Sequence, residues 1–519
     1  MISAPRPLHA SDGAPLPMNR VLKALRKQFT VEVGPVTVVR RRHLDTFDHL
    51  LTDAGLHLEH HLARRVDQLV LTGATMPITM TAPAGADLRW PAMADVLVPG
   101  PLRDAVARAS GIRALTVQSD QRRRVRRVEL RNSDDKVVAR LEIDEPAAPS
   151  ETTPAPSLRV LALRGYDNDA RRVTEIVTRA GLSDQPVSTT TYAEVFPPAT
   201  RRAPMRQDPA ATLLAQSLQG FAAAMSANLQ GLIDDVDTEF LHDLRVAVRR
   251  TRSTLKLGRT ALPDDMRTRW EPAFKWVGDL TTPVRDLDVY QLDLPKMASW
   301  LTAAQPGDLE SFAEHLNARR STARRTLLRG LRGVHYRTLM ADWDEALAEL
   351  ASAGHEPDVP TAGQLSDQAL SRAHRRVAKG GGAIDNDSPH EALHDMRKRC
   401  KELRYALEVF APVLDPTMRK QAVADLKGLQ DVLGRFQDSE VQRLALRDFA
   451  AEMMADGTSP AAVLAMGELI AHLEAEQARA RREFEEVFAR FERPENADRM
   501  RALSGDTTLG KATPTEATA

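Results

Sequence analysis

Two short motifs in the sequence combine a histidine, an aspartate and several basic residues in the same order. His242-Asp243-Leu244-Arg245 recurs as His394-Asp395-Met396-Arg397, an offset of 394 − 242 = 152 residues. The same offset, without a gap, relates Arg249 to Lys401, Arg252 to Arg404, Leu255 to Leu407, Lys275 to Lys427, Asp286 to Asp438 and Val289 to Val441. A register kept over this length indicates two copies of one supersecondary unit, related by a pseudo-two-fold axis.

Helical spacing places the basic residues of each copy on one face. With an advance of about 100° per residue, the first copy's basic residues fall within a sector of roughly 80°. The two stripes are His242, Arg245, Arg249, Arg252 and Lys256, and His394, Arg397, Lys401 and Arg404. An apolar stripe lies roughly a quarter turn away in each copy and is expected to face the core. Cations on neighbouring turns repel each other, and no acids interleave them, so the stripes predict an anionic ligand.

Further basic clusters on the expected helices can extend these stripes. Arginine binds phosphate oxygens through a planar fork, whereas lysine acts as a point charge. A repetitive, flexible and densely charged polyanion would satisfy such a surface. The alternative is that the stripes are solvated helix faces, but their repetition with a histidine at each head argues for a site. The additional candidates for the site are Arg324, Arg325, Lys379, Arg481 and Arg482.

The acidic residues and the cysteine beside the stripes have simpler interpretations. Asp243 and Asp395 directly follow the histidines, about 100° around the helix, so they point elsewhere and a metal site is disfavoured. They are expected to orient a basic side chain or to cap a helix. Cys400 falls on the apolar stripe and is expected in the core. We therefore predict no catalytic residue, no metal and no cofactor for this region.

Composition limits the classes of protein that the chain can belong to. Its 519 residues require two or three domains, and 42% hydrophobic with 27% charged residues is typical of a globular protein. The 4% of aromatic residues and zero net charge disfavour a nucleic-acid binder. The single cysteine excludes an internal disulfide, and no apolar run predicts a membrane span or a signal peptide. The expected location is the cytoplasm.

The pattern of residues changes character once along the chain. Residues 20–198 read as mixed α and β, with strands at 31–42, 68–72, 78–81 and 157–163, helices at 46–54, 101–109 and 167–180, and a hairpin joining 124–130 to 137–143. From 208 onward helical periodicity dominates, with helices expected at 208–234, 238–260, 264–280, 284–303, 308–330, 363–379, 389–411, 416–433, 437–456 and 459–491. Residues 1–19 and 501–519 are expected to be disordered. The boundary is expected at 196–204.

The helical region resembles the CHAD domain family, the conserved histidine α-helical domain. The resemblance rests on the two His-Asp-x-Arg stripes and on Arg285-Asp286-x-Asp288-Val289, which is matched by Gln437-Asp438-x-Glu440-Val441. It covers residues 205–495, with repeats at about 208–335 and 363–492. It implies two four-helix bundles about a pseudo-two-fold axis, a basic central surface and binding of inorganic polyphosphate. Gln437 and Glu408 depart from their counterparts Arg285 and Lys256, so the second half is expected to bind less strongly.

The N-terminal region, 20–198, resembles a degenerate CYTH domain, which has a triphosphate tunnel fold. The segment from Leu44 to Leu58 and the hairpin that ends at Asp144 carry this resemblance. The family's Glu-x-Glu-x-Lys strand is absent, because Val31-Glu32-Val33-Gly34 holds one glutamate and no following lysine. In that family, alternating carboxylates in the tunnel hold a catalytic divalent metal. Because this chain lacks that strand, we expect no hydrolysis. The expected fold class is multidomain α+β: an antiparallel β domain followed by an all-α domain.

The leading hypothesis is a non-enzymatic protein that binds inorganic polyphosphate, associates with polyphosphate granules or regulates polyphosphate metabolism. Its partners would be polyphosphate and, beyond that, a second copy of the chain or a polyphosphate-metabolising enzyme. One alternative is a metal-dependent triphosphatase or polyphosphate hydrolase that uses the N-terminal domain. The other is a nucleic-acid-binding protein, which sparse aromatic residues and zero net charge disfavour.

Overall fold

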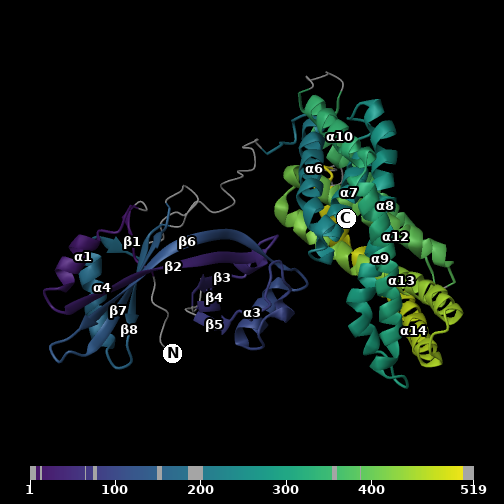
Figure 1. Cartoon of the computed structure of the whole chain (residues 1–519). Helices are drawn as coiled ribbons and strands as arrows, with labels where there is room; N and C mark the ends of the chain where they lie inside the picture. The colour runs from purple at the N-terminus through teal and green to yellow at the C-terminus, as the bar shows by residue number, and fades with distance from the viewer. Residues whose placement is uncertain are drawn as a thin grey trace, which may run out of the picture. The chain divides into compact units, whose positions relative to one another are not determined.

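The computed structural model describes residues 7–11, 14–64, 66–73, 79–148, 155–184, 203–352, 359–385 and 387–505. The chain divides into two compact units, Met1–Arg201 and Arg202–Ala519 (Figure 1). Most of the boundary predicted at 196–204 lies outside the described residues. The first unit is an antiparallel β domain, and the described residues of the second form helices and their connections but no strand, as the sequence predicts.

The first unit is built on a seven-stranded antiparallel sheet with the order β5-β4-β3-β2-β6-β7-β8. The strands are β2 (Thr30–Thr46), β3 (Leu56–Ala63), β4 (Val66–Gly73), β5 (Thr79–Pro83), β6 (Leu115–Arg131), β7 (Val137–Pro146) and β8 (Ser157–Ala162). The long central strands β2 and β6 run side by side as an arch (Figure 1). The predicted hairpin is present as β6 and β7, and its turn is held by Asn132, whose side-chain oxygen accepts from the amides of Asp134 and Lys136.

A bulge in β2 bends this central strand pair. The pairing of β2 with β6 shifts between Val33 and Val36. A Cβ atom on Gly34 would lie 2.9 Å from the carbonyl oxygen of Arg127, so the close approach of the two strands requires glycine there. The segment from which the CYTH resemblance expects a metal-binding strand is thus a bent strand that carries the single glutamate Glu32.

Short helices cover the two ends of the sheet. At one end α1 (Met18–Leu25) and α4 (Asp167–Arg179) share a core with β6, β7 and β8. At the other end α2 (Leu50–Asp53) and α3 (Pro101–Ser110) pack on β3, β4 and β5. A two-stranded sheet joins β1 (His9–Ala10) to β9 (Leu182–Ser183). Part of the N-terminal segment predicted as disordered is therefore ordered, because β1 pairs with β9 and α1 contributes apolar side chains to the core.

The second unit repeats its first three helices with the offset found in the sequence. The first half comprises α6 (Ala210–Asp234), α7 (Thr238–Leu257), α8 (Asp264–Ala298), α9 (Glu310–Arg332) and α10 (Val334–Ser352). The second half comprises α11 (Ala362–Gly381), α12 (His390–Val409), α13 (Pro416–Ala455), α14 (Pro460–Phe491) and α15 (Pro494–Leu503). The first three helices of the second half each start 152 residues after their counterparts, so the duplication is structural as well as sequential.

Contacts between the halves also obey the pseudo-two-fold relation. The amide of Ala210 donates to the carbonyl of Pro360 at 3.0 Å, and the amide of Ala362 donates to the carbonyl of Asp208 at 2.7 Å. Each of these bonds is the image of the other under the 152-residue offset, which is the pattern of a self-complementary interface. One apolar core spans both halves, and a second core joins the far ends of α8, α9, α13 and α14.

The structure corrects several helix boundaries. The helices predicted at 264–280 and 284–303 form the single helix α8, despite Pro272, Pro283 and Pro295 within it. Near Pro283 the side-chain hydroxyls of Thr281 and Thr282 donate to the carbonyl of Gly278, and buried residues pack on both sides of the proline. The helices predicted at 416–433 and 437–456 are likewise the single helix α13. Tertiary packing overrides the local breaking signals in both cases.

Two further differences concern the ends of each half. The helix α10 was not predicted, although Tyr336, Leu339, Trp343, Leu347 and Leu350 recur at helical spacing and are buried. Helix α15 includes 501–503 of the tail predicted as disordered, because Met500 and Leu503 pack into the core that spans both halves.

Candidate functional site

A groove of about 560 Å³ lies between α7 and α12, the two helices that carry the basic stripes. It brings together residues from both halves, and five of the predicted site residues line it: His242, Arg249, Arg397, Lys401 and Arg404. The other lining residues are Asp243, Val246, Arg250, Tyr405, Glu408 and Gln430. We call this hollow the central groove. The sequence prediction that duplication brings the two stripes together agrees with this geometry.

Burial of the apolar stripes turns the basic stripes outward. In α7, Leu244, Val248 and Leu255 are at most 2% exposed, and in α12 Met396, Cys400 and Leu403 are at most 1% exposed. The start of α7 is fixed by Asp237, whose carboxylate accepts from the amides of Glu239 and Phe240. The interpretation of Cys400 as a core residue is supported by its burial, which raises the pKa of its thiol to about 12.

The first arginine of each stripe is tied to the following helix. Arg245 donates from Nη1 to the Thr281 and Thr282 hydroxyls at 2.9 and 2.8 Å, and to the carbonyl of Gly278 at 3.2 Å. Its counterpart Arg397 donates to the carbonyl of Leu433 and to the carboxylate of Asp438, both at 3.1 Å. These two arginines hold α7 on α8 and α12 on α13, so part of their hydrogen-bonding capacity is already used.

The next cation of each stripe is not paired with an acid. Arg249 and its counterpart Lys401 have no carboxylate partner among the described residues, and the Arg249 guanidinium lies 5.9 Å from the centre of the Tyr405 ring. Desolvation, Arg397 and Arg249 lower the pKa of Lys401, in that order. Cations therefore lie close to one another in the central groove, and Asp438 offsets only part of their effect on the pKa of Lys401.

The second half carries an acid where the first half carries a cation. Glu408, the counterpart of Lys256, pairs with Arg404 at 2.6 Å and with Arg250 of the first half at 3.2 Å. The sequence predicts weaker binding in the second half on the basis of this substitution. The ion pairs give that prediction a physical basis, since Glu408 neutralises charge at one end of the central groove.

The two histidines differ in their surroundings. Burial and then Arg285 lower the pKa of His242, which lines the central groove. The Nδ1 atom of His394 instead hydrogen-bonds to the side-chain oxygen of Gln437, the residue that replaces Arg285. The Arg285 guanidinium pairs with Glu239 at 3.2 Å. The first histidine therefore lies near an ion pair, whereas the second is hydrogen-bonded to a neutral amide.

The remaining predicted residues do not line the central groove. Arg252 is half-buried, and Lys256 pairs with Glu271 and lines a neighbouring hollow. Arg324 donates to the carbonyls of Leu232 and Ile233 at the end of α6 and pairs with Asp235. Arg481 hydrogen-bonds to the carbonyl of Ser388, Arg325 to the hydroxyl of Thr322, and Arg482 and Lys379 lie exposed on α14 and α11.

Sequence reasoning missed Arg250, Tyr405 and Gln430 as lining residues. Arg250 and Tyr405 directly follow stripe residues in the chain. A helical wheel drawn around the stripe alone excludes such neighbours, but a groove between two helices admits residues on both flanks of each. Gln430 comes from α13, which no pattern in the stripes could reveal.

The first unit has its own polar hollow, of about 230 Å³, on the sheet. Its acids are engaged by bases: Asp144 pairs with Arg123 at 2.7 Å and with Arg41. Burial alone would raise the pKa of Glu59, but hydrogen bonds with His57 and His61 bring it well below its usual value. Across the described ranges, no three His, Cys, Asp or Glu side chains gather closely enough to hold a metal ion.

One finding bears on membranes. Within the part of the chain that the structure describes, no helix has the length and apolar character needed to cross a bilayer.

Part of the helical unit matches a known family. Residues 216–447 match the family model of the CHAD domain. Over 208 residues the chain is 26% identical to two Mycobacterium tuberculosis proteins named "Uncharacterized protein Rv2226" (strain H37Rv) and "Uncharacterized protein MT2285" (strain CDC 1551). Each match covers 39% of this chain and only 39% of the relative's length.

Two solved structures are similar to part of the chain. The CHAD domain from the plant Ricinus communis is 24% identical, with a TM-score of 0.45, and the match covers 59% of this chain and 95% of that one. PptA from Streptomyces chartreusis is 21% identical, with a TM-score of 0.43, and the match covers 54% of this chain and all of that one.

Proposed function

We propose that this protein binds inorganic polyphosphate in the central groove without cleaving it, and the match of residues 216–447 to the CHAD family model supports this. The observation that carries the proposal is the convergence of cations from both halves on one surface. Five arginine and lysine side chains line the groove against two acids, which leaves a surplus of three positive charges. Desolvation, and after it the neighbouring charges of Arg397 and Arg249, lower the pKa of Lys401, as expected where cations converge.

The chemistry of the groove favours a flexible chain of phosphates over a compact anion. The cations are spread along two helices, and most are arginines, whose planar forks suit phosphate oxygens. A chain with one negative charge on every phosphate can follow this path and neutralise several cations at once. Binding of this kind releases counterions and weakens steeply as salt rises.

The first unit would be a scaffold or a regulatory module rather than an active enzyme. Asp144 and Glu59 are held by arginines and histidines, so neither presents a free carboxylate to a divalent cation. Hydrolysis of the tunnel type requires such carboxylates. Binding by the helical unit would serve association with polyphosphate granules or regulation of a polyphosphate-metabolising partner.

Titration of the full chain with long-chain polyphosphate tests the proposal, with duplex DNA as competitor at matched phosphate concentration. We expect polyphosphate to bind and DNA to compete weakly. Equal competition by DNA would favour a nucleic-acid binder, and absence of polyphosphate binding would refute the proposal. In a parallel assay with Mg²⁺ or Mn²⁺ we expect no phosphate release. Release that is lost in Glu32→Gln would instead establish the enzyme.

A further inference from the structure

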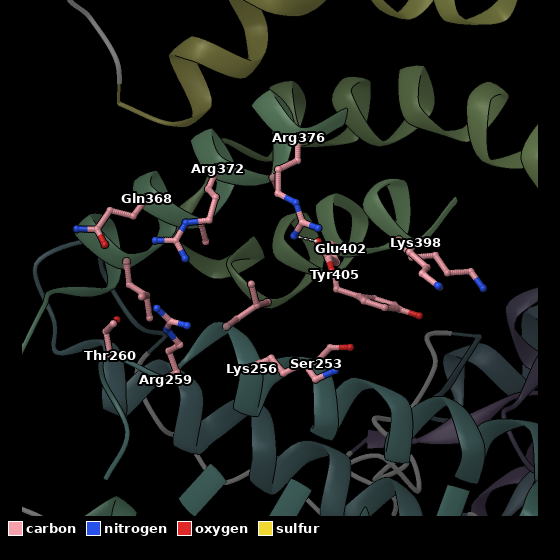
Figure 2. Close-up of a pocket in the computed structure, with 15 residues that line it drawn as sticks. Ser253, Lys256, Arg259, Thr260, Gln368, Arg372, Arg376, Lys398, Glu402 and Tyr405 are labelled. Carbon is pink, nitrogen blue, oxygen red and sulfur yellow. Dashed lines mark hydrogen bonds and ion pairs between the residues drawn. The ribbon is translucent and has the colours of Figure 1, made fainter. Parts of the chain in front are cut away.

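A second hollow, of about 440 Å³, opens beside the central groove between α7, α11 and α12. Figure 2 shows Arg372 and Arg376 reaching into it from α11, with Lys256 and Arg259 opposite them from α7 and the turn that follows it. Lys401 and Tyr405 line both hollows, so the two are adjacent. We call this one the side pocket. Its volume falls in the range of small-molecule sites, roughly 300–1,000 Å³.

The lining of the side pocket has two kinds of surface. Its apolar part comes from Leu257, Leu365, Ala369, Ala373 and the ring of Tyr405, which Figure 2 shows lying between α12 and α7. Six lining residues are basic: Lys256, Arg259, Arg372, Arg376, Lys398 and Lys401. A chain of phosphates alone cannot gain binding free energy from the apolar part. Burying that surface favours a ligand that carries an apolar or aromatic group.

Among the described residues, three of these six basic side chains have no carboxylate partner. Arg376 pairs with Glu402 at 2.5 Å, Lys398 with Asp395 at 3.1 Å and Lys256 with Glu271 at 3.4 Å. Arg259, Arg372 and Lys401 have no carboxylate partner in the described ranges. Three polar side chains that can form hydrogen bonds with a ligand also line the pocket: Ser253, Thr260 and Gln368.

The side pocket is not part of the duplicated pattern. Under the 152-residue offset, Lys256, Arg259, Arg372, Arg376 and Lys398 correspond to Glu408, Ala411, Gly220, Ala224 and Val246. The offset also replaces Ala373 by the bulkier Phe221. Only Lys401 has a basic counterpart, Arg249. The basic lining of the side pocket is therefore not repeated at the equivalent positions of the other half, whereas the stripes of the central groove are.

We propose that the side pocket binds a nucleoside di- or triphosphate. The flat base would stack on Tyr405 and cover the apolar surface, and the phosphates would reach Arg259, Arg372 and Lys401. The shared Lys401 and Tyr405 make nucleotide occupancy sensitive to a polyanion in the central groove. The site itself stands on its own geometry and does not require that the proposed polyphosphate binding be correct.

Calorimetric titration of the full chain, without divalent cations, can separate the two parts of the ligand. The probes are ATP, adenosine, inorganic tripolyphosphate and octyl phosphate. We expect ATP to bind at least about tenfold more tightly than either adenosine or tripolyphosphate, because only ATP uses both surfaces. Equal affinity for ATP and tripolyphosphate, or tighter binding of octyl phosphate than of ATP, would overturn the nucleotide assignment.

Two variants test the location. Arg259→Ala with Arg372→Ala removes exposed cations and is expected to weaken ATP binding about tenfold or more. Ala369→Leu fills the apolar part and is expected to weaken ATP binding while leaving tripolyphosphate binding unchanged. The matched control is Arg337→Ala with Arg447→Ala, which removes the same charge from exposed positions that line neither hollow. Unchanged ATP affinity in both test variants would place the nucleotide elsewhere and refute the proposal.

Discussion

The two halves of the helical unit start their first three helices at equivalent residues but use equivalent side chains differently. Arg245 donates hydrogen bonds to three acceptors on α8. Arg397 donates to one carbonyl and to the exposed carboxylate of Asp438 on α13. Lys256 becomes Glu408, and the arginine at 285 becomes Gln437. Duplication has preserved the scaffold that positions the central groove, while the charges around it have diverged. The two halves can therefore serve as controls for each other.

The largest expected difference between the halves lies in a buried ion pair. Asp288, which is fully buried, accepts from Arg320 at 2.6 Å, and Arg320 also holds Asp235. The counterpart of Asp288 is Glu440, which pairs with the half-exposed His390. Arg320→Ala is expected to lower the free energy of unfolding by about 3 kcal/mol. His390→Ala is expected to cost less than about 1 kcal/mol. Urea denaturation measures both.

The pH dependence of the Arg320→Ala loss checks its cause. Burial already raises the pKa of Asp288 despite the hydrogen bond from Arg320. Without Arg320, the folded-state pKa of Asp288 rises further. The loss of stability in Arg320→Ala is therefore full at neutral pH and shrinks as the pH falls and Asp288 becomes protonated. A loss that stays constant between pH 7.5 and pH 5 would mean that the buried charge is not its source.

A smaller difference is expected for the first arginines of the stripes. Arg245→Ala removes three hydrogen bonds of a charged donor and is expected to cost about 2 kcal/mol of stability. Arg397→Ala removes two bonds, one of them to a carboxylate that is 62% exposed, and is expected to cost about 1 kcal/mol. Thermal or urea unfolding of both variants provides the comparison. Equal losses would show that the two arginines are equivalent in the scaffold.

The charge reversal at Glu408 should affect binding more than stability. Glu408→Gln removes the acid that Arg250 and Arg404 share, and it restores positive charge to the central groove. We expect polyphosphate affinity to rise by about threefold to tenfold at low salt. Glu486→Gln, which removes an exposed acid from α14, is the control and should change affinity little. A fall in affinity would mean that Glu408 organises the arginines for binding.

The smallest expected effect concerns the histidines. The folded-state pKa of His242 lies below its ordinary value, so the free protein should lose stability as the pH falls through about 6.5. Bound phosphates favour the imidazolium, and polyphosphate affinity should therefore rise by a few-fold over the same range. His242→Gln should reduce this rise, and His394→Gln, whose ring is engaged by Gln437, serves as the comparison. Affinity measured from pH 7.5 to pH 5.5 tests this.

Sequence alone predicted the features that depend on periodicity. The stripe positions, the duplication and the hairpin of β6 and β7 follow from residue spacing and turn chemistry. The continuity of α8 through Pro283 could not be predicted from local signals, because buried residues on both sides of the proline pack into the core and the side chains that meet at the Gly278 carbonyl come from two helices. The different roles of Arg245 and Arg249 could not be predicted either. Both lie on one helix face, and they differ in that α8 supplies hydrogen-bond acceptors to Arg245.

The central claim is that Arg249 and Lys401, rather than the scaffolding arginines, bind the polyanion. The most direct test is polyphosphate binding to the full chain across a salt series, for wild type and for Arg249→Ala with Lys401→Ala. The control is the exposed pair Arg337→Ala with Arg447→Ala. We predict at least a tenfold loss at low salt and a slope of log affinity against log salt that is shallower by about 1 to 2. Wild-type affinity and slope in the Arg249/Lys401 variant would contradict the account.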